Sequence, residues 1–475
     1  MTEYVGEKKG VNDYNIMAVF TEAEKLYVDE LIHNAKDALD EMESYTQEQV
    51  DAIVKAVART TFLHARELAE LACEETRMGN VEDKVGKIYG KARAIWWDLK
   101  FKKSRGVLSE DPTTGITEIA RPVGVVTATT PCTNPVICPM GNVMLATKCA
   151  NSIIIAPHPR GKRVAQKLLE LWLPEFEKLG CPKNMVQVCV STSNEMTAYL
   201  MSQGDVVVAT GGPGMVKAAY SSGKPSYGVG PGNVPTIFDR DINIKKAVSS
   251  VIEGRTFDNG VICASEQSLI LPREHYEEIL SEFVSQGCVR VSDPETVKKV
   301  ETALFPNHII SREAVGQSAS KCMELAGIAV PDQTKAIIIE LDKPGKSHDL
   351  NKEKMMPVMC AYPYDTWEEA LNMAKENLDF EGKGHTACIH SYNEKHILQA
   401  GLTLKVSRVI CNHPSSKNTG GSFMNGLNPT TTIGCSTWGG NSISENLAYY
   451  HMMNKIRIAR VKPGWSMPSD EEIWA

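Results

Sequence analysis

The chain has 475 residues, of which 42% are hydrophobic and 23% charged, an ordinary globular composition with room for two or more domains. A formal net charge of -7 and the lack of any basic block argue against nucleic acid and against an anionic membrane as partners. Thirteen cysteines without a CxxC pair, and eleven histidines without HExxH, favour a reducing compartment and no structural metal. We therefore expect a cytoplasmic protein.

The first hundred residues are predicted to be mostly helical. Residues 1–20 form a polar lead-in without the apolar core of a signal peptide. Two capping boxes, Thr21 with Glu24 and Thr46 with Gln49, then predict the starts of helices. Apolar residues keep helical spacing through 47–71 and 83–99, and these helices show packing without visible chemistry.

A change of pattern near residue 106 predicts β-structure. The segment 106–117 alternates around Pro-Thr-Thr-Gly and predicts a projecting β-hairpin. Short β-branched runs then alternate with spans long enough for helices, which indicates βαβ units and a parallel sheet covered on both faces. These runs lie at 123–127, 153–156, 185–190, 205–210 and 234–238.

A second α/β block extends from about 239 to 414. Its predicted helices include 273–285 and 367–377, and its predicted strands include 336–340 and 387–391. A Gly/Ser/Asn-rich run at 415–441 precedes an expected apolar helix at 442–453 and a strand-like segment at 455–461. The predicted fold class is therefore α/β, with two doubly wound domains.

Three motifs follow strands of the first predicted sheet. They are Thr129–Asn134, Pro157–Arg160 and Thr210–Gly214, and ligands of parallel sheets bind at such carboxyl ends. Gly-Gly-Pro-Gly at the start of a helix can present backbone N–H groups to a phosphate, although such a motif more commonly forms only a tight turn. No GxGxxG follows the first strand, so the ordinary dinucleotide fingerprint is absent.

Cys263 is the candidate nucleophile. It follows a turn-forming Asp-Asn-Gly in TFDNGVICASEQ, at 256–267, and precedes small residues. The competing interpretation is an inert, buried cysteine, which is the commoner role of this residue type.

Seven stretches together resemble the aldehyde dehydrogenase superfamily, and specifically its CoA-acylating branch. The resemblance covers nearly the whole chain and is strongest to acylating succinate-semialdehyde and sulfoacetaldehyde dehydrogenases, then to the aldehyde half of bifunctional alcohol/aldehyde dehydrogenases. The stretches are ATTPCTNPV at 128–136, IAPHPR at 155–160, ATGGPGMVKAAYSSGKPSYGVGPGN at 209–233, FDNGVICASEQS at 257–268, KEKMMPV at 352–358, EGKGHTACIHS at 381–391 and IGCSTWGGNSISENL at 433–447.

The resemblance implies three functional regions. A nicotinamide-cofactor domain would comprise 21–105 and 119–238, and a catalytic domain would comprise 239–441. An oligomerisation arm would be built from 106–118 and 442–475. Because exposed strand edges of such an arm pair between protomers, we expect a homodimer or homotetramer.

The resemblance also implies a reaction. The Cys263 thiolate would add to an aldehyde, and Asn134 with the backbone N–H of Cys263 would hold the oxyanion while hydride leaves for NAD or NADP. Hydrolysing relatives activate water with a glutamate in a motif resembling ELGGKSP, whereas this chain has VGPGNVP with Val229 at that position. An apolar side chain is no general base, so coenzyme A is expected to accept the acyl group. His385, in GKGHTA, would position or deprotonate the CoA thiol, or is a structural loop histidine.

Cofactor-binding residues are likewise implied by the resemblance. Glu353 matches a glutamate that binds the nicotinamide ribose in relatives resembling EEIFGPV. Arg160 and Arg163 leave a 2′-phosphate, and hence NADP, open beside NAD. The remaining cofactor candidates are Thr129, Pro157, His158, Arg160, Gly211, Gly212 and Gly214.

The substrate is the least determined feature. Relatives that act on anionic semialdehydes are expected to carry an arginine in a motif resembling WGRN, and here Gly440 occupies that position. Lys417 offers a positive charge instead, or is a solvated loop lysine, so acetaldehyde also stays open. The rival functions are a non-acylating dehydrogenase that releases free acid, an acyl-phosphate reductase similar to glutamyl-phosphate reductase, and a silent scaffold of the same fold.

Overall fold

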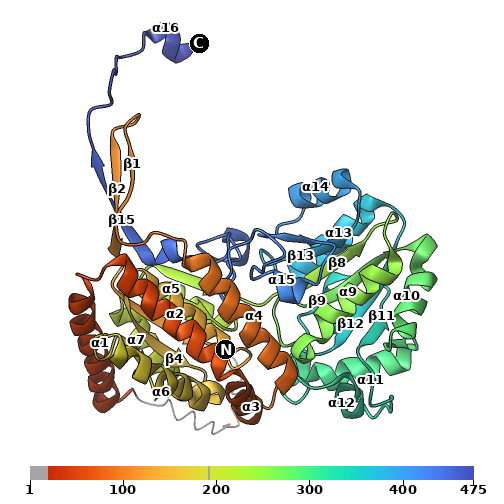
Figure 1. Ribbon diagram of the computed structural model, residues 1–475. Helices are drawn as coiled ribbons and strands as arrows, with labels where there is room; N and C mark the ends of the chain where they lie inside the picture. The colour runs from red at the N-terminus through yellow and green to blue at the C-terminus, as the bar shows by residue number, and fades with distance from the viewer. Residues whose placement is uncertain (1–19, 191–192) are drawn as a thin grey trace, which may run out of the picture.

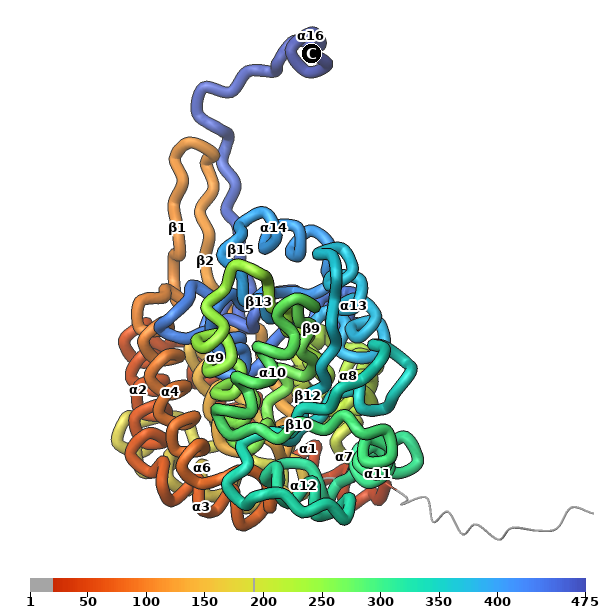
Figure 2. The backbone as a smooth tube through the Cα atoms, turned by 90° about the vertical axis from the view of Figure 1, so that its right-hand side faces the viewer, coloured from red at the N-terminus to blue at the C-terminus, as the bar shows by residue number. Residues whose placement is uncertain are grey.

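The computed structural model describes residues 20–190 and 193–475 as two α/β lobes with a β-arm that projects from one of them (Figure 1). Figure 2, turned by 90°, shows the arm rising clear of both lobes. Most of the lead-in expected at 1–20 lies outside the described residues. No helix in the described part of the chain is long and apolar enough to cross a bilayer.

The N-terminal helices begin where the sequence predicts them. Both capping boxes form, because the side chains of Thr21 and Thr46 each accept the backbone N–H of the residue three positions on, and their own backbone N–H groups donate to the side chain of that residue. The segment 47–71 is divided at His64, which ends one helix and begins the next. The helices are α1 Glu22–Met42, α2 Gln47–Leu63, α3 Ala65–Thr76 and α4 Val81–Leu99.

The first lobe is built on a five-stranded parallel sheet in the order β5-β4-β3-β6-β7. Helices α1 and α7 contact each other on one side, and α5 and α6 both contact α2 on the other. The strands are β3 Val125–Thr130, β4 Ser152–Pro157, β5 Val186–Val188, β6 Val206–Thr210 and β7 Ser226–Val229, and the helices are α5 Ile137–Lys148, α6 Lys162–Lys178, α7 Asn194–Gln203 and α8 Pro213–Tyr220.

The second lobe has a seven-stranded parallel sheet in the order β10-β11-β12-β9-β8-β13-β14. Its strands are β8 Val234–Phe238, β9 Glu266–Pro272, β10 Val289–Val291, β11 Ile337–Glu340, β12 Val358–Tyr364, β13 Ala387–His390 and β14 Val409–Cys411. Its helices are α9 Ile244–Thr256, α10 Tyr276–Ser285, α11 Pro294–Leu304, α12 Ala319–Leu325, α13 Trp367–Phe380, α14 Glu394–Thr403 and α15 Ser415–Asn418.

One strand belongs to a different sheet from the one the sequence indicates. The run Val234–Phe238, assigned by its position to the first block, pairs with β9 and β13 in the second sheet. The fifth place in the first sheet is taken by β7, which pairs with β6 from Ser226 to Val229. Gly228 within this short stretch marks a turn by sequence, and only the pairing with β6 makes the stretch a strand.

The arm is a three-stranded antiparallel sheet in the order β1-β2-β15, with β1 Gly106–Asp111, β2 Ile116–Pro122 and β15 Met453–Ala459. The last helix, α16 Asp470–Trp474, lies at its far end (Figure 1). The apolar helix predicted at 442–453 is wrong. That segment is mostly extended, with one 3-10 turn at Tyr449–Met452, because the backbone of its first part forms hydrogen bonds with residues 432–436.

Candidate active site

The predicted cofactor motifs meet at one edge of the first sheet. β4, β3 and β6 are neighbours, so their carboxyl ends at Pro157, Thr130 and Thr210 lie side by side. The His158 N–H donates to the Thr130 carbonyl at 2.9 Å, which joins two of the motifs directly. Thr129 Oγ1 is buried nearby without a partner among the described residues.

Gly211, Gly212 and Gly214 surround the start of α8 at this edge. Gly212 is the N-cap of α8 and supplies no side chain to its first N–H groups. A Cβ added at Gly212 or Gly214 would meet no atom within 4 Å, so a ligand can approach the backbone there. Both arginines of the 157–163 stretch already have protein partners. The Arg160 guanidinium donates to the Thr76 carbonyl, and Arg163 Nη1 donates to Glu74 Oε1 at 2.8 Å.

Cys263 lies on a tight turn between α9 and β9. Asp258 and Asn259 both adopt a left-handed backbone with φ of 53°, which lets the chain reverse before the cysteine. Cys263 and Asn134 line the same cavity of ≈290 Å³. Helix α4, the loop after β3, the turn before Cys263 and residues 416–433 form its walls.

Two N–H donors near Cys263 are free to bind an oxyanion. Lys87 Nζ donates to Asn134 Oδ1 at 2.9 Å, and since an ammonium is only a donor, the amide oxygen must face the lysine. The Asn134 NH₂ group therefore points away from Lys87. Among the described residues nothing accepts the Cys263 backbone N–H or the Asn134 NH₂. These groups are the kind of donor pair that stabilises a developing alkoxide.

A buried ion cluster connects α4 to the turn that precedes Cys263. Asp258 Oδ2 accepts from Lys84 Nζ at 2.9 Å and from Lys87 Nζ at 2.5 Å, and all three side chains are buried. Burial lowers the pKa of Lys87, and the Asp258 carboxylate opposes that shift. The expectation that 83–99 serves packing alone is therefore wrong. Its sequence signal was three lysines, at 84, 87 and 91, recurring at helical spacing among apolar residues.

The surroundings of Cys263 disfavour its thiolate form. Burial raises its pKa well above the usual range, and the Glu353 carboxylate adds to the shift. The buried Arg408 guanidinium acts in the opposite direction. Nothing in the sequence pattern singled out Arg408, which reaches the site by donating to the carbonyls of His385 and Gly434.

Glu353 is held close to Cys263 by backbone contacts. Its Oε1 accepts the Gly232 N–H at 3.1 Å, and its own N–H donates to Glu381 Oε2 at 2.6 Å. Burial raises the pKa of Glu353 to about 8, and the charge of Glu381 adds to this. The other carboxylate oxygen of Glu353 makes no hydrogen bond to the described residues, so it is available to a ligand.

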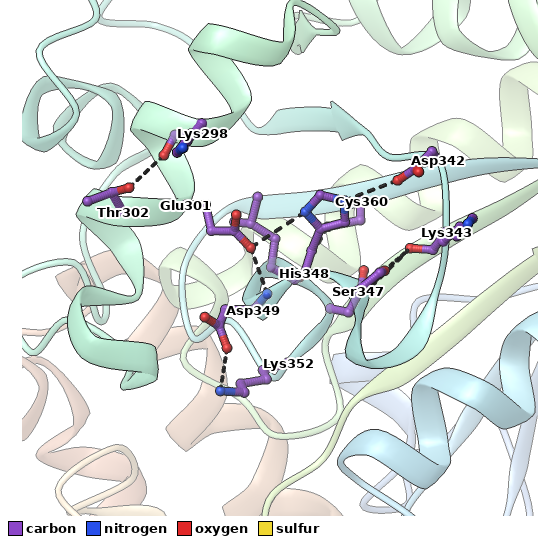
Figure 3. Close-up of polar contacts among 12 residues, drawn as sticks. Lys298, Glu301, Thr302, Asp342, Lys343, Ser347, His348, Asp349, Lys352 and Cys360 are labelled. Carbon is purple, nitrogen blue, oxygen red and sulfur yellow. Dashed lines mark hydrogen bonds and ion pairs between the residues drawn. The ribbon is translucent and has the colours of Figure 1, made fainter.

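A polar network fixes the loop that leads to Glu353 (Figure 3). Glu301 Oε1 accepts the Asp349 backbone N–H at 2.7 Å and lies 3.6 Å from His348 Nδ1, while His348 Nε2 lies 3.1 Å from Asp342 Oδ1. Lys352 Nζ then pairs with Asp349 Oδ1 at 2.6 Å. These contacts tie the chain just before Glu353 to α11.

His385 is neutral where it lies. Burial lowers its pKa to about 3, and the nearby Arg408 charge acts in the same direction. Its Nδ1 is 2.9 Å from Thr386 Oγ1, and its buried Nε2 has no partner among the described residues. Gly232 separates His385 from the nucleophile, because a Cβ there would lie 1.9 Å from the Cys263 carbonyl oxygen and 3.3 Å from His385 Cδ2.

A second groove of ≈570 Å³ lies between the lobes, lined by α8, residues 378–383 and residues 435–440. Trp438 and Gly440, considered by sequence as the place of an anion clamp, line this groove and are absent from the walls of the Cys263 cavity. Lys417 lies in the Cys263 cavity, where its Nζ pairs with Glu253 Oε1 at 2.7 Å. Val229 is buried at the end of β7.

Comparisons with known proteins are consistent across sequence and structure. The pattern of the aldehyde dehydrogenase family matches residues 10–445. The succinate-semialdehyde dehydrogenase (acetylating) of Clostridium kluyveri is 48% identical over 447 residues, 94% of this chain and 98% of that protein. The sulfoacetaldehyde dehydrogenase (acylating) of Cupriavidus necator is 37% identical over 434 residues, 90% of this chain and 88% of that protein. A crystal structure of an acetylating aldehyde dehydrogenase from Geobacillus thermoglucosidasius superimposes with a TM-score of 0.90 at 34% identity, covering 94% of this chain and 99% of that one.

Proposed function

Because this chain belongs to the aldehyde dehydrogenase family, we propose that Cys263 and Asn134 carry out the acylating oxidation of a short aldehyde, or its reversal. The observation that carries the proposal is the pair of open N–H donors, on Asn134 and on Cys263 itself, in the cavity that holds the thiol. The Cys263 sulfur bonds to the aldehyde carbon as the thiol proton leaves to solvent, and the two donors hold the resulting oxyanion.

The nicotinamide cofactor fits the residues present. Glu353 keeps one carboxylate oxygen free for a ribose hydroxyl, and Gly212 and Gly214 leave the first turn of α8 open to a phosphate. When bound, the nicotinamide supplies the hydride acceptor. Arg160 and Arg163 have protein partners, but each guanidinium keeps further N–H donors, so we propose either NAD or NADP as the cofactor.

Coenzyme A is the proposed acyl acceptor. Loss of hydride leaves an acyl thioester on Cys263, and the CoA thiol then displaces Cys263 to release acyl-CoA and restore the enzyme thiol. Val229, at the position of the water-activating glutamate in hydrolysing relatives, supports this route because it cannot accept a proton. His385 positions the incoming thiol through its free Nε2, since burial keeps its imidazole neutral.

Succinate semialdehyde is the substrate we favour, with sulfoacetaldehyde and acetaldehyde as alternatives. The support is the 48% identity with the Clostridium kluyveri protein, which carries that substrate in its name. We further propose that the arm formed by β1, β2 and β15 joins protomers into a dimer or tetramer, because the residues of β15 after Met453 are exposed.

The test is the initial rate of NADH formation with each of the three aldehydes, with and without CoA. We expect sustained turnover only when CoA is present, with acyl-CoA as the product detected by mass spectrometry. The Cys263→Ala variant should form neither NADH nor acyl-CoA. Equal sustained rates without CoA, with free acid as the product, would instead assign the chain to the hydrolytic reaction.

A further inference from the structure

The cavity that holds Cys263 is lined by three lysines and by no aspartate or glutamate of the described chain. Two of these lysines are neutralised by carboxylates outside the lining. Lys87 pairs with Asp258 at 2.5 Å, and Lys417 pairs with Glu253 at 2.7 Å while lying 4.6 Å from the Phe257 ring centre. The third, Lys91, forms no ion pair with any described carboxylate.

The Lys91 ammonium is held in place by hydrogen bonds that use only two of its three N–H donors. Its Nζ donates to the carbonyls of Gly420 at 2.7 Å and Gly421 at 3.1 Å. An ammonium has three N–H donors, so one remains for a group in the cavity. Burial lowers the pKa of Lys91 to about 8, and the charge of Lys87 acts in the same direction. A partly desolvated cation with a spare donor and no counter-ion is a site for an anion.

The position of Lys91 relative to Asn134 fixes what kind of anion fits. Lys91 follows Lys87 by one turn of α4, a rise of about 5–6 Å along the same face, and Lys87 contacts the oxyanion residue Asn134. Gly86 and Gly90 also line the cavity, and a Cβ at either would meet no atom within 4 Å, so the space beside the lysines is open. Ile137 and Ile433 supply apolar wall for a short carbon spacer.

We propose that Lys91 binds the terminal carboxylate of the aldehyde substrate and is thereby a specificity-determining residue for a short ω-carboxylate aldehyde. The proposal rests on the proposed acylating function. The aldehyde carbon lies at Cys263 with its oxygen at Asn134, and the spacer places the carboxylate one helical turn away, at the spare N–H of Lys91. An arginine at position 440, as in the WGRN motif, is then not needed to bind the carboxylate, because Gly440 lies in the other groove.

The experiment compares succinate semialdehyde with butyraldehyde, an uncharged aldehyde of the same length, in the wild type and in Lys91→Met. A hydrogen bond to a charged group is worth enough that its loss lowers kcat/KM for succinate semialdehyde by about ten- to a hundredfold. Most of the change should appear in KM, since the contact is present in ground and transition states alike. The value for butyraldehyde should stay within about threefold, because the lost contact involves only the carboxylate.

Three further variants make the result specific. Lys91→Arg keeps the charge and should restore most of the preference for succinate semialdehyde. Lys55→Met, at an exposed lysine on the neighbouring α2, controls for the general loss of one positive charge. Lys417→Met tests the competing cation. If Lys417→Met and not Lys91→Met abolishes the preference, or if Lys91→Met changes both aldehydes equally, the assignment to Lys91 is overturned.

A binding measurement separates this proposal from the proposed reaction. Succinate should raise the Tm of the wild type and of Lys55→Met but not that of Lys91→Met. Should the wild type fail to turn over any aldehyde with CoA, the acylating function falls. The Lys91 site would then still stand if succinate stabilises the wild type and Lys55→Met but not Lys91→Met, and would fall if it stabilises Lys91→Met equally.

Discussion

Lys87 Nζ lies 2.9 Å from Asn134 Oδ1, so the amide of Asn134 is oriented by a lysine that precedes it by 47 residues. Without this contact the amide can rotate and present its oxygen to the forming oxyanion. The lysine also pairs with Asp258 on the nucleophile turn. One side chain thus contacts both Asn134 and the turn that precedes Cys263.

We expect Lys87→Met to lower kcat by about ten- to a hundredfold, less than the loss of about 10²–10³ expected for Asn134→Ala. KM for the aldehyde should change little, because the oxyanion contact matters in the transition state. Steady-state kinetics of both variants and their double mutant provide the check. If the double mutant lost the product of the two single effects, the residues would act independently, against the positioning role.

Glu353 is expected to disfavour the thiolate form of Cys263. Its carboxylate helps to raise the pKa of Cys263, so Glu353→Gln should lower that pKa and increase the thiolate fraction at a given pH. The measurement is the rate of iodoacetamide labelling of the Cys263 peptide, followed by mass spectrometry from pH 7 to 10. Labelling of the wild type should rise with pH over the whole range, and Glu353→Gln should react faster above about pH 8, where Glu353 of the wild type is ionised. A slower variant would contradict this prediction.

His385 should contribute to acyl transfer without titrating. Because burial lowers its pKa to about 3, the imidazole stays neutral above pH 4 and no His385 limb should appear in the kcat/KM profile for CoA between pH 5 and 8. His385→Ala should lower kcat/KM for CoA by about tenfold or more, in the range of a lost hydrogen bond. The burst of NADH in the absence of CoA should persist, because it precedes acyl transfer. Loss of the burst would assign His385 to the first half-reaction instead.

Gly232→Ala is expected to be severely destabilising. The new Cβ would lie 1.9 Å from the Cys263 carbonyl oxygen, a backbone atom that cannot turn aside, and overpacking of this kind costs about 1–3 kcal/mol or more. Gly230→Ala, two residues earlier, is the matched control because a Cβ there meets nothing within 4 Å. Urea unfolding of the two variants gives the comparison. Equal stability would show that the nucleophile turn relaxes without cost.

Sequence patterns predict much of this fold because short-range signals determine its elements. The capping boxes and the β-branched runs specify helices and parallel strands locally. Two errors, at 234–238 and 442–453, arise where pairing between distant segments decides the outcome. Neither sheet membership nor the backbone partners of an apolar segment can be read from its own residues.

Some residues of the candidate site could be predicted from sequence motifs, and others could be found only from the fold. Cys263, Asn134 and Glu353 stand in recognisable motifs, and the structure places Cys263 and Asn134 in one cavity. Lys87 and Lys91 belong to a helix whose pattern indicates packing, and their roles depend on partners up to 330 residues away. A buried lysine and a solvated one look alike in sequence, so only the fold distinguishes them.

The Asp258 cluster also determines how far the chain can be dissected. Its carboxylate belongs to the second lobe, and both of its cations come from a helix of the N-terminal segment. A fragment that starts after residue 238 would therefore lose both cations that pair with Asp258, together with the helix that covers this carboxylate. The second lobe is therefore not expected to fold as an independent unit, and circular permutants or split versions will have to keep α4 and the turn before Cys263 in the same assembled unit.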